Sequence, residues 1–275
     1  MPLAENRLSE AVSVFTYGGE TLATSYGVNA VAFFGRGATV LVDPFVSRVQ
    51  AAELDALLEA RDAAPVTKVV LTHHHTDHAL GASWFLQGGA EVIAHAAAAE
   101  RMAKEHAGLI AERRRDPALA SLFEGAEPYA PTRLVTDGLA FEAGGLRFDV
   151  FHPGHAHTPG DLCVYAPALG VLVAGDLVST GYHPNLEDSD PAGWRAALER
   201  LRLLPFWVLV PGHGMPGGRE AVEKQLAYFD RARRIVVGTP DSAGAEGTSS
   251  ALTRAFPGFR LEIVLPALVD RLRRP

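Results

Sequence analysis

The stretch from His73 to His78 constrains this chain more than any other feature, because it gathers histidine and aspartate side chains within one turn of backbone. It directly follows an apolar run, residues 66–71, that is typical of a buried strand. In an extended segment side chains alternate between two faces. We therefore expect His73 and His75 to point to the same side and to hold one ion, whereas His74 points away.

Asp77 and His78 come where the pattern changes from that of a strand to that of a helix. They could hold a second ion beside the first. Neutral imidazole together with carboxylate suits zinc, iron or manganese. The sequence therefore predicts a metal site at the end of a buried strand.

Three further segments offer metal ligands, and each lies at or just after a strand-like run. They are His157 in A-H-T-P-G-D, Asp176 in A-G-D and His213 in P-G-H-G. Loops at strand ends are where rigid α/β sheets present functional groups, so the distance between these residues along the chain does not prevent a shared site. We expect His157 beside the first pair, His213 beside Asp77 and His78, and Asp176 between the two ions.

The pattern of elements indicates mixed α/β layers. The strands are predicted at 11–17, 29–34, 38–42, 66–71, 91–94, 146–151, 162–165, 171–174 and 206–210. The helices are predicted at 51–61, 79–87, 96–115, 191–204, 220–237 and 261–274. Residues 116–132 are predicted to be irregular, and residues 238–250 to be a flexible stretch rich in small and polar residues. The strands on either side of the middle helices suggest two similar halves, each a sheet covered on one face by helices.

The ordered motifs H-x-H-x-D-H, A-H-T-P-G-D, A-G-D and P-G-H-G resemble those of the metallo-β-lactamase superfamily in its dinuclear form, over about residues 12–217. The resemblance implies an α/β fold, a four-layer αββα sandwich with the metals at one edge of the two sheets. It also implies the ligand set given above and two divalent ions, zinc first, with iron or manganese as alternatives. Asp43 resembles the family's aspartate that orients ligands without binding metal. We expect one domain over 1–275, with a metal-site core at 12–217 and a helical C-terminal extension at 218–275.

These expectations lead to a hydrolase. A hydroxide bridging two adjacent divalent ions would cleave a small ester, thioester, lactone or lactam. Asp77 is expected to be the catalytic residue that orients the hydroxide or passes a proton. The alternative is an oxidoreductase of the same fold, similar to a persulfide dioxygenase with one iron. Ser179 stands where related lactamases carry a basic residue and lactone hydrolases a tyrosine, so the substrate class stays open.

Composition narrows the partners. The 275 residues carry 25 Lys plus Arg against 32 Asp plus Glu, a net charge of −7, which disfavours nucleic acid and leaves a small-molecule substrate. The chain shows neither a signal-like start nor a run of membrane-spanning length, so we expect a cytoplasmic protein that does not bind membranes. Its oligomeric state stays open, with a homodimer as one option. The single cysteine, Cys163, is expected to be a buried apolar residue.

Three other histidine predictions complete the list. His155 is expected to be a solvated loop residue, and His95, His106 and His152 to be structural and far from the motifs. His183, with Tyr182 and Asn185, is predicted either to line the substrate pocket or to have a structural role, with neither option favoured.

Overall fold

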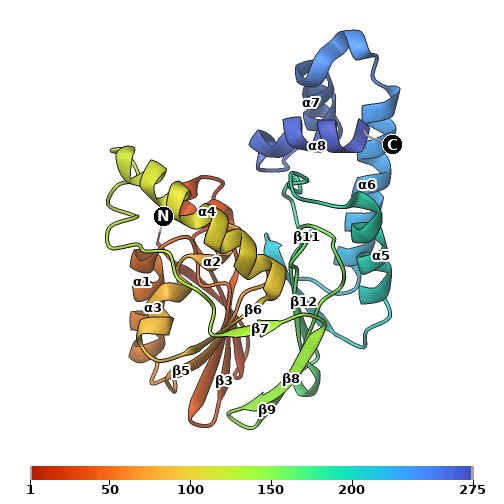
Figure 1. Ribbon diagram of the computed structural model, residues 1–275. Helices are drawn as coiled ribbons and strands as arrows, with labels where there is room; N and C mark the ends of the chain where they lie inside the picture. The colour runs from red at the N-terminus through yellow and green to blue at the C-terminus, as the bar shows by residue number, and fades with distance from the viewer. Residues whose placement is uncertain (1, 274–275) are drawn as a thin grey trace.

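The computed structural model describes residues 2–273 and shows two β-sheets packed face to face, with helices on both outer faces (Figure 1). The predicted four-layer αββα sandwich is therefore confirmed.

The first sheet has seven strands in sequence order, antiparallel from β1 to β4 and parallel from β4 to β7. Its strands are β1 (Ala4–Ser9), β2 (Val12–Thr16), β3 (Ala30–Gly35), β4 (Ala38–Val42), β5 (Val66–Val70), β6 (Glu91–His95) and β7 (Arg133–Val135). Its helices are α1 (Arg48–Ala60), α2 (Thr76–Ala79), α3 (Ala82–Gln87) and α4 (Ala96–Arg115).

The second sheet has five strands in the order β12-β11-β10-β9-β8, antiparallel except for the parallel pair β11–β12. Its strands are β8 (Gly138–Ala143), β9 (Leu146–Phe151), β10 (Cys163–Ala166), β11 (Val171–Ser179) and β12 (Val208–His213). Its helices are α5 (Pro191–Leu201), α6 (Glu220–Gly238), α7 (Gly244–Ala255) and α8 (Leu265–Arg273).

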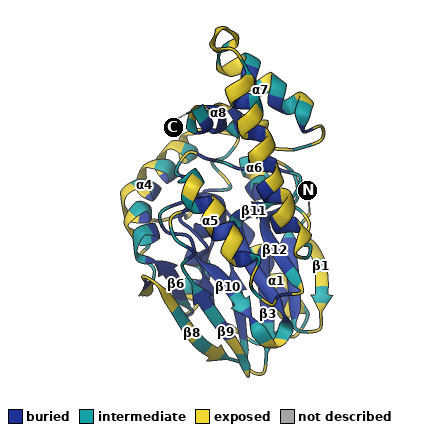
Figure 2. Ribbon diagram, turned by 90° about the vertical axis from the view of Figure 1, so that its right-hand side faces the viewer, coloured by how far each residue is buried: buried dark blue, intermediate teal, exposed yellow. Residues whose placement is uncertain are grey.

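Alternating side chains of the strands build three apolar layers. Figure 2 shows most of the central strands in the dark blue of buried residues. In β3, Val31 and Phe33 pack between the sheets, while Ala30 and Ala32 face α1 and α3. The same alternation in β11 places Val173 between the sheets and directs Leu172 toward the second helical layer. The two sheets are thereby fixed against each other, which holds their loop-bearing ends at one edge.

The predicted helix 79–87 is wrong, because the structure has two short helices there. Gly81 lies against the loop before α1, where an added Cβ would come within 1.8 Å of the Pro44 carbonyl oxygen, and its N–H donates to the Phe45 carbonyl. This contact turns the chain between α2 and α3. The metal motif therefore leads into a helix of four residues, not into a long one.

The flexible stretch predicted at 238–250 is also wrong, since most of it forms α7. Buried Thr248 and Leu252 hold this helix against α6 and α8. The last helix begins later than predicted, at Leu265, and Arg274 lies outside the described residues. Three strands, β1, β7 and β8, were not predicted and are found only in the structure.

Candidate metal centre

The ends of both sheets bring the predicted first ligand group together. His73 and His75 lie in the loop between β5 and α2, and His157 lies in the loop between β9 and β10. Ligand atoms of all three fall within 4.8 Å of one another. His75 Nδ1 and His157 Nε2 face each other at 3.0 Å. Three imidazoles from two sheets thus converge on one point.

The predicted second ligand group lies beside the first. Asp77 and His78 are in α2, and His213 is the last residue of β12. Asp77 Oδ2 lies 3.5 Å from His78 Nε2 and 3.5 Å from His213 Nε2. This is a second cluster in which one carboxylate and two imidazoles could hold a cation.

Asp176 lies between the two groups, inside β11 and not after it as predicted. Its Oδ1 is 3.2 Å from His78 Nε2, and its Oδ2 is 3.3 Å from His213 Nε2. The same Oδ2 is 3.6 Å from His157 Nε2. One carboxylate therefore contacts ligands of both groups, as a bridging ligand must.

Three of the candidate ligand atoms are buried without a hydrogen-bond partner in the described part of the chain, and this bears on whether metal ions fit the site. His73 Nε2, His78 Nε2 and Asp176 Oδ1 are buried and have no hydrogen-bond partner among residues 2–273. Buried polar atoms are rarely left unpaired, because desolvation without a partner costs free energy. Their convergence, with nitrogen and carboxylate oxygen as donors, fits divalent cations such as zinc.

Each candidate histidine ligand is oriented through its other ring nitrogen, as is usual around metals. The partners lie on different elements: Thr72 Oγ1 for His73 at 3.0 Å, Asp188 Oδ2 for His75 at 3.0 Å, Asp43 Oδ2 for His78 at 2.8 Å, the Asn185 carbonyl for His157 at 3.0 Å and the Tyr26 carbonyl for His213 at 3.1 Å. These contacts leave the inward nitrogens free for metal.

Asp43 has the orienting position that the sequence predicts. It is 1% exposed, and besides His78 it accepts hydrogen bonds from the Thr72 N–H and hydroxyl at 2.8 and 2.5 Å. Its φ of 54° lies in the left-handed region, which costs free energy for a residue with a Cβ. The carboxylate thereby ties β4, β5 and α2 together beneath the metal ligands.

The electrostatics of the two groups also favour cations. Burial lowers the pKa of His157 to about 3 and lowers the pKa of His73 well below its usual value, so both rings are neutral and able to bind metal at pH 7. Burial opposes the charged forms of His78 and Asp176 as well. Nevertheless, nearby carboxylates raise the pKa of His78, and nearby imidazoles hold the pKa of Asp176 well below its usual range. Positive charge is therefore stabilised between them.

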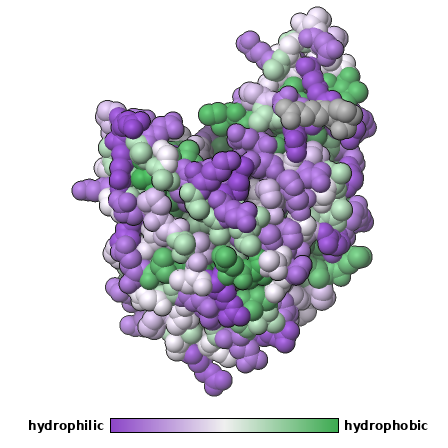
Figure 3. Space-filling view, in the orientation of Figure 1, coloured by the Kyte–Doolittle hydropathy of each residue, from purple (hydrophilic) through white to green (hydrophobic). Residues whose placement is uncertain are grey.

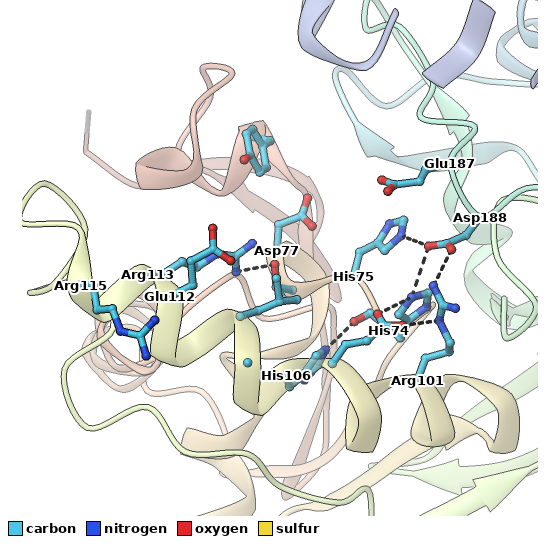
Figure 4. Close-up of a pocket in the computed structure, with 15 residues that line it drawn as sticks. His74, His75, Asp77, Arg101, His106, Glu112, Arg113, Arg115, Glu187 and Asp188 are labelled. Carbon is cyan, nitrogen blue, oxygen red and sulfur yellow. Dashed lines mark hydrogen bonds and ion pairs between the residues drawn. The ribbon is translucent and has the colours of Figure 1, made fainter. Parts of the chain in front are cut away.

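A pocket of about 890 Å³ opens over two of the candidate ligands, His75 and Asp77, and Figure 3 shows the surface hollowed between α4 and α8. His75 and Asp77 lie at its centre in Figure 4, with Arg113 of α4 on one side and Asp188 on the other. A cavity of this size suits a small organic molecule.

The remaining histidines have structural contacts. His74 is buried beside Asp188 and Glu105, with its Nε2 3.5 and 3.7 Å from their oxygens. His155 is exposed, as predicted. His106 is not far from the motif, because its ring contacts the His74 carbonyl at 2.8 Å.

Of the two roles left open for His183, the structure shows the structural one. His183 contacts the Tyr228 hydroxyl at 2.6 Å among aromatic rings of the C-terminal helices. Tyr182 lines a different cavity, and Asn185 acts through its carbonyl on His157. Cys163 is fully buried, as predicted, and burial raises the pKa of its thiol.

Sequence reasoning missed Asp188, which lies in the loop between β11 and α5. It contacts His75 on one oxygen and pairs with Arg101 on the other. The only signal was its position in a polar loop after Asp176. Its partner Arg101 is far away in sequence, on α4, so the contact depends on the assembled fold.

Comparisons with known proteins agree with this geometry. The chain is 28% identical over 221 residues to a linear primary-alkylsulfatase of Pseudomonas sp. (strain ATCC 19151), covering 68% of this chain and 42% of the relative. It is 28% identical over 185 residues to a metallo-beta-lactamase type 2 of Bacillus sp. (strain 170), covering 66% and 64%. The chain thus spans less than two thirds of the length of both relatives.

A solved metallo-beta-lactamase from Pontibacter korlensis has the same fold, with a TM-score of 0.69 at 23% identity over 82% of this chain and 98% of that one. Residues 23–213 match the sequence profile of the metallo-beta-lactamase superfamily, from the loop before β3 to the last ligand, His213. With the fold, the ligand clusters and this match in agreement, the chain belongs to the metallo-beta-lactamase superfamily.

Proposed function

We propose that this protein is a metal-dependent hydrolase that holds two divalent ions, zinc first, and cleaves a small ester, thioester, lactone or lactam. One observation carries the proposal: the unpaired ligand atoms of two adjacent clusters converge on Asp176 beneath an open pocket. The names of the two relatives support hydrolytic chemistry.

The chain's own residues have distinct tasks in this proposal. Two ions, when bound, supply hydroxide at neutral pH and polarise the bond to be cleaved. One ion would be held by His73, His75 and His157. The other would be held by Asp77, His78 and His213, with Asp176 between the two groups. Asp77 also lines the pocket, where its carboxylate can orient the attacking water and accept its proton.

The experiment that tests this proposal is metal quantification on the purified protein. It is followed by hydrolysis assays with a lactam, a lactone, a thioester, carboxylic esters and a primary alkyl sulfate. The alkyl sulfate is included because of the alkylsulfatase relative. Two zinc ions per chain, with turnover that chelator abolishes and zinc restores, is the expected result. One iron per chain with oxygen consumption would establish the oxidoreductase alternative instead.

In this proposal the protein acts on a small molecule and binds neither nucleic acid nor a membrane. None of the helices within residues 2–273 is long and apolar enough to cross a membrane. The cytoplasmic location, the homodimer option and the division into core and extension stay predictions.

A further inference from the structure

Arg113 of α4 lines the pocket next to the metal motif. Its Nη1 donates to Thr76 Oγ1 at 2.8 Å, and Thr76 stands between the two candidate ligands His75 and Asp77. The guanidinium carbon also lies 5.3 Å from the centre of the Phe123 ring. These contacts hold the cation at the rim of the ligand cluster.

This guanidinium has no carboxylate partner within 4.0 Å among residues 2–273, although it is partly buried. Its neighbours differ: Arg101 pairs with Asp188 and Glu105, and Arg114 with Glu127. A partly buried cation without an ion-pair partner is costly, and burial accordingly lowers the pKa of Arg113. The charge is therefore available to an anion that enters the pocket.

The groups that face Arg113 include two of opposite charge and one neutral donor. The first acid is Asp77, whose negative charge is neutralised by metal in the proposed centre. Glu112 is exposed on the same helix. The neutral group is Tyr26, which lines the same pocket. Because burial raises the pKa of its phenol, Tyr26 is uncharged at pH 7 and does not compete for the guanidinium as an anion.

Tyr26 lies in a segment with an unusual backbone conformation. It and Ser25 have φ values of 50° and 49°, in the left-handed region that residues with a Cβ rarely adopt. The Tyr26 carbonyl accepts from the His213 ring, while its hydroxyl makes no hydrogen bond within residues 2–273. The phenol is thus a second free donor at the pocket.

We propose that Arg113, with the Tyr26 hydroxyl, binds a carboxylate or sulfate group carried by the substrate. The inference rests on the proposed hydrolase and names its substrate class, an anionic organic molecule. Because Thr76 joins Arg113 to the motif, an anion bound there places the rest of the molecule over His75 and Asp77. Arg113 is then a specificity-determining residue, since it meets the substrate away from the bond that is cleaved.

The first test compares Arg113→Gln with Arg115→Gln in the metal-loaded protein. Arg115 lines the same pocket from the same helix but is exposed, and serves as the matched control. The substrates are mono-4-nitrophenyl succinate and neutral 4-nitrophenyl butyrate. We expect Arg113→Gln to raise KM for the succinate about 10- to 100-fold with little change in kcat, because a charge-assisted hydrogen bond is lost. KM for the butyrate should stay within about threefold of the original value.

Arg113→Lys should recover part of the affinity, since it keeps the charge but loses the fork of donors. A purely structural role would raise KM for both esters, or lower kcat and melting temperature together. Equal effects on the two esters, or an equal effect of Arg115→Gln, would overturn the inference.

A second test does not depend on turnover. Calorimetric binding of octanoate, octyl sulfate and neutral octanamide to the metal-loaded protein should show both anions bound more tightly than the amide, with the difference lost in Arg113→Gln. The two anions tell carboxylate from sulfate recognition. If the panel shows no hydrolysis but this preference is found, the hydrolase proposal fails while the anion site stands; no preference for either anion refutes the site itself.

Discussion

At the scale of single residues, Asp77 differs from Asp176 because it lines the large pocket as well as contacting other candidate ligands. Asp176 is turned inward, between the two groups. In the proposed hydrolase, the carboxylate on the pocket wall can therefore act on the attacking water, whereas the inward carboxylate can only hold metal.

Asp77→Ala should therefore lower kcat by about 100-fold or more, the range of lost general acid–base catalysis, beyond any effect of lost metal. The measurement is kcat at saturating zinc, with the metal content of each sample determined in parallel. Asp77→Asn is the control that keeps an oxygen ligand but cannot accept a proton. An Asp77→Ala protein with both ions and full turnover would contradict the assigned role.

At the scale of elements, the site depends on how closely β11 and β12 approach. A Cβ added to Gly212 would come within 1.8 Å of Asp176 Oδ1, so only glycine lets the two strands pass beside the bridging carboxylate. The P-G-H-G motif thus supplies one candidate ligand, His213, and its Gly212 leaves room for the carboxylate of another, Asp176.

Gly212→Ala should displace Asp176 and reduce bound metal from two ions to one or none per chain, as measured by elemental analysis after dialysis. The reason is steric, because the contact is far inside van der Waals range and its partner is a fixed carboxylate. Gly108→Ala is the matched control, since nothing lies within 4 Å of its Cβ position in α4.

That control carries a prediction of its own. Alanine in a helix interior is favoured over glycine by roughly 0.5–1 kcal/mol, so Gly108→Ala should raise the free energy of unfolding by about that amount while metal content stays unchanged. Urea denaturation of both glycine variants and the wild type measures this free energy.

For Gly212→Ala, a metal content equal to that of the wild type would show that the strands β11 and β12 can separate without loss of metal.

At the scale of the whole molecule, the C-terminal helices are joined to the metal core through an aromatic cluster. His183, in the loop after β11, packs with Tyr228 of α6 and with Phe256 and Phe259 around α7. This cluster fixes the C-terminal helices against the loop that follows β11.

The cluster should make stability sensitive to acid. Burial lowers the pKa of His183 to about 4, below its ordinary value of 6.5. The unfolded chain then binds a proton before the folded one, so stability is full above pH 6.5 and falls as the pH drops toward 4. Between pH 7 and pH 5 the expected loss from this residue is about 2 kcal/mol.

His183→Phe keeps an aromatic ring but cannot be protonated, so its loss of stability between pH 7 and pH 5 should be smaller than that of the wild type by about this amount. Urea unfolding of the chelated proteins at both pH values measures it. His155→Phe, at an exposed position, is the comparison. Parallel pH curves for His183→Phe and the wild type would show that His183 does not titrate in this window.

The sequence by itself singled out the seven candidate ligands, because imidazole and carboxylate at strand ends have few other uses and because strand periodicity is a local property. The order of strand and helix patterns indicated two halves, each a sheet with helices, and the family that the motifs resemble implied the four-layer sandwich, in which residues such as Val31 and Phe33 fill the space between the sheets. Boundaries failed where a distant contact overrode local preference, as Gly81 against Pro44 did in splitting a helix.

Only the tertiary structure decided which residues surround the ligands. Asp188 orients His75, the Tyr26 carbonyl orients His213 and Arg113 reaches Thr76, and each pair is widely separated along the chain. Such contacts leave no periodic signal, because they depend on which surfaces the two sheets bring together. The candidate metal ligands can therefore be found from short motifs, whereas the side chains that surround them depend on how the two sheets pack.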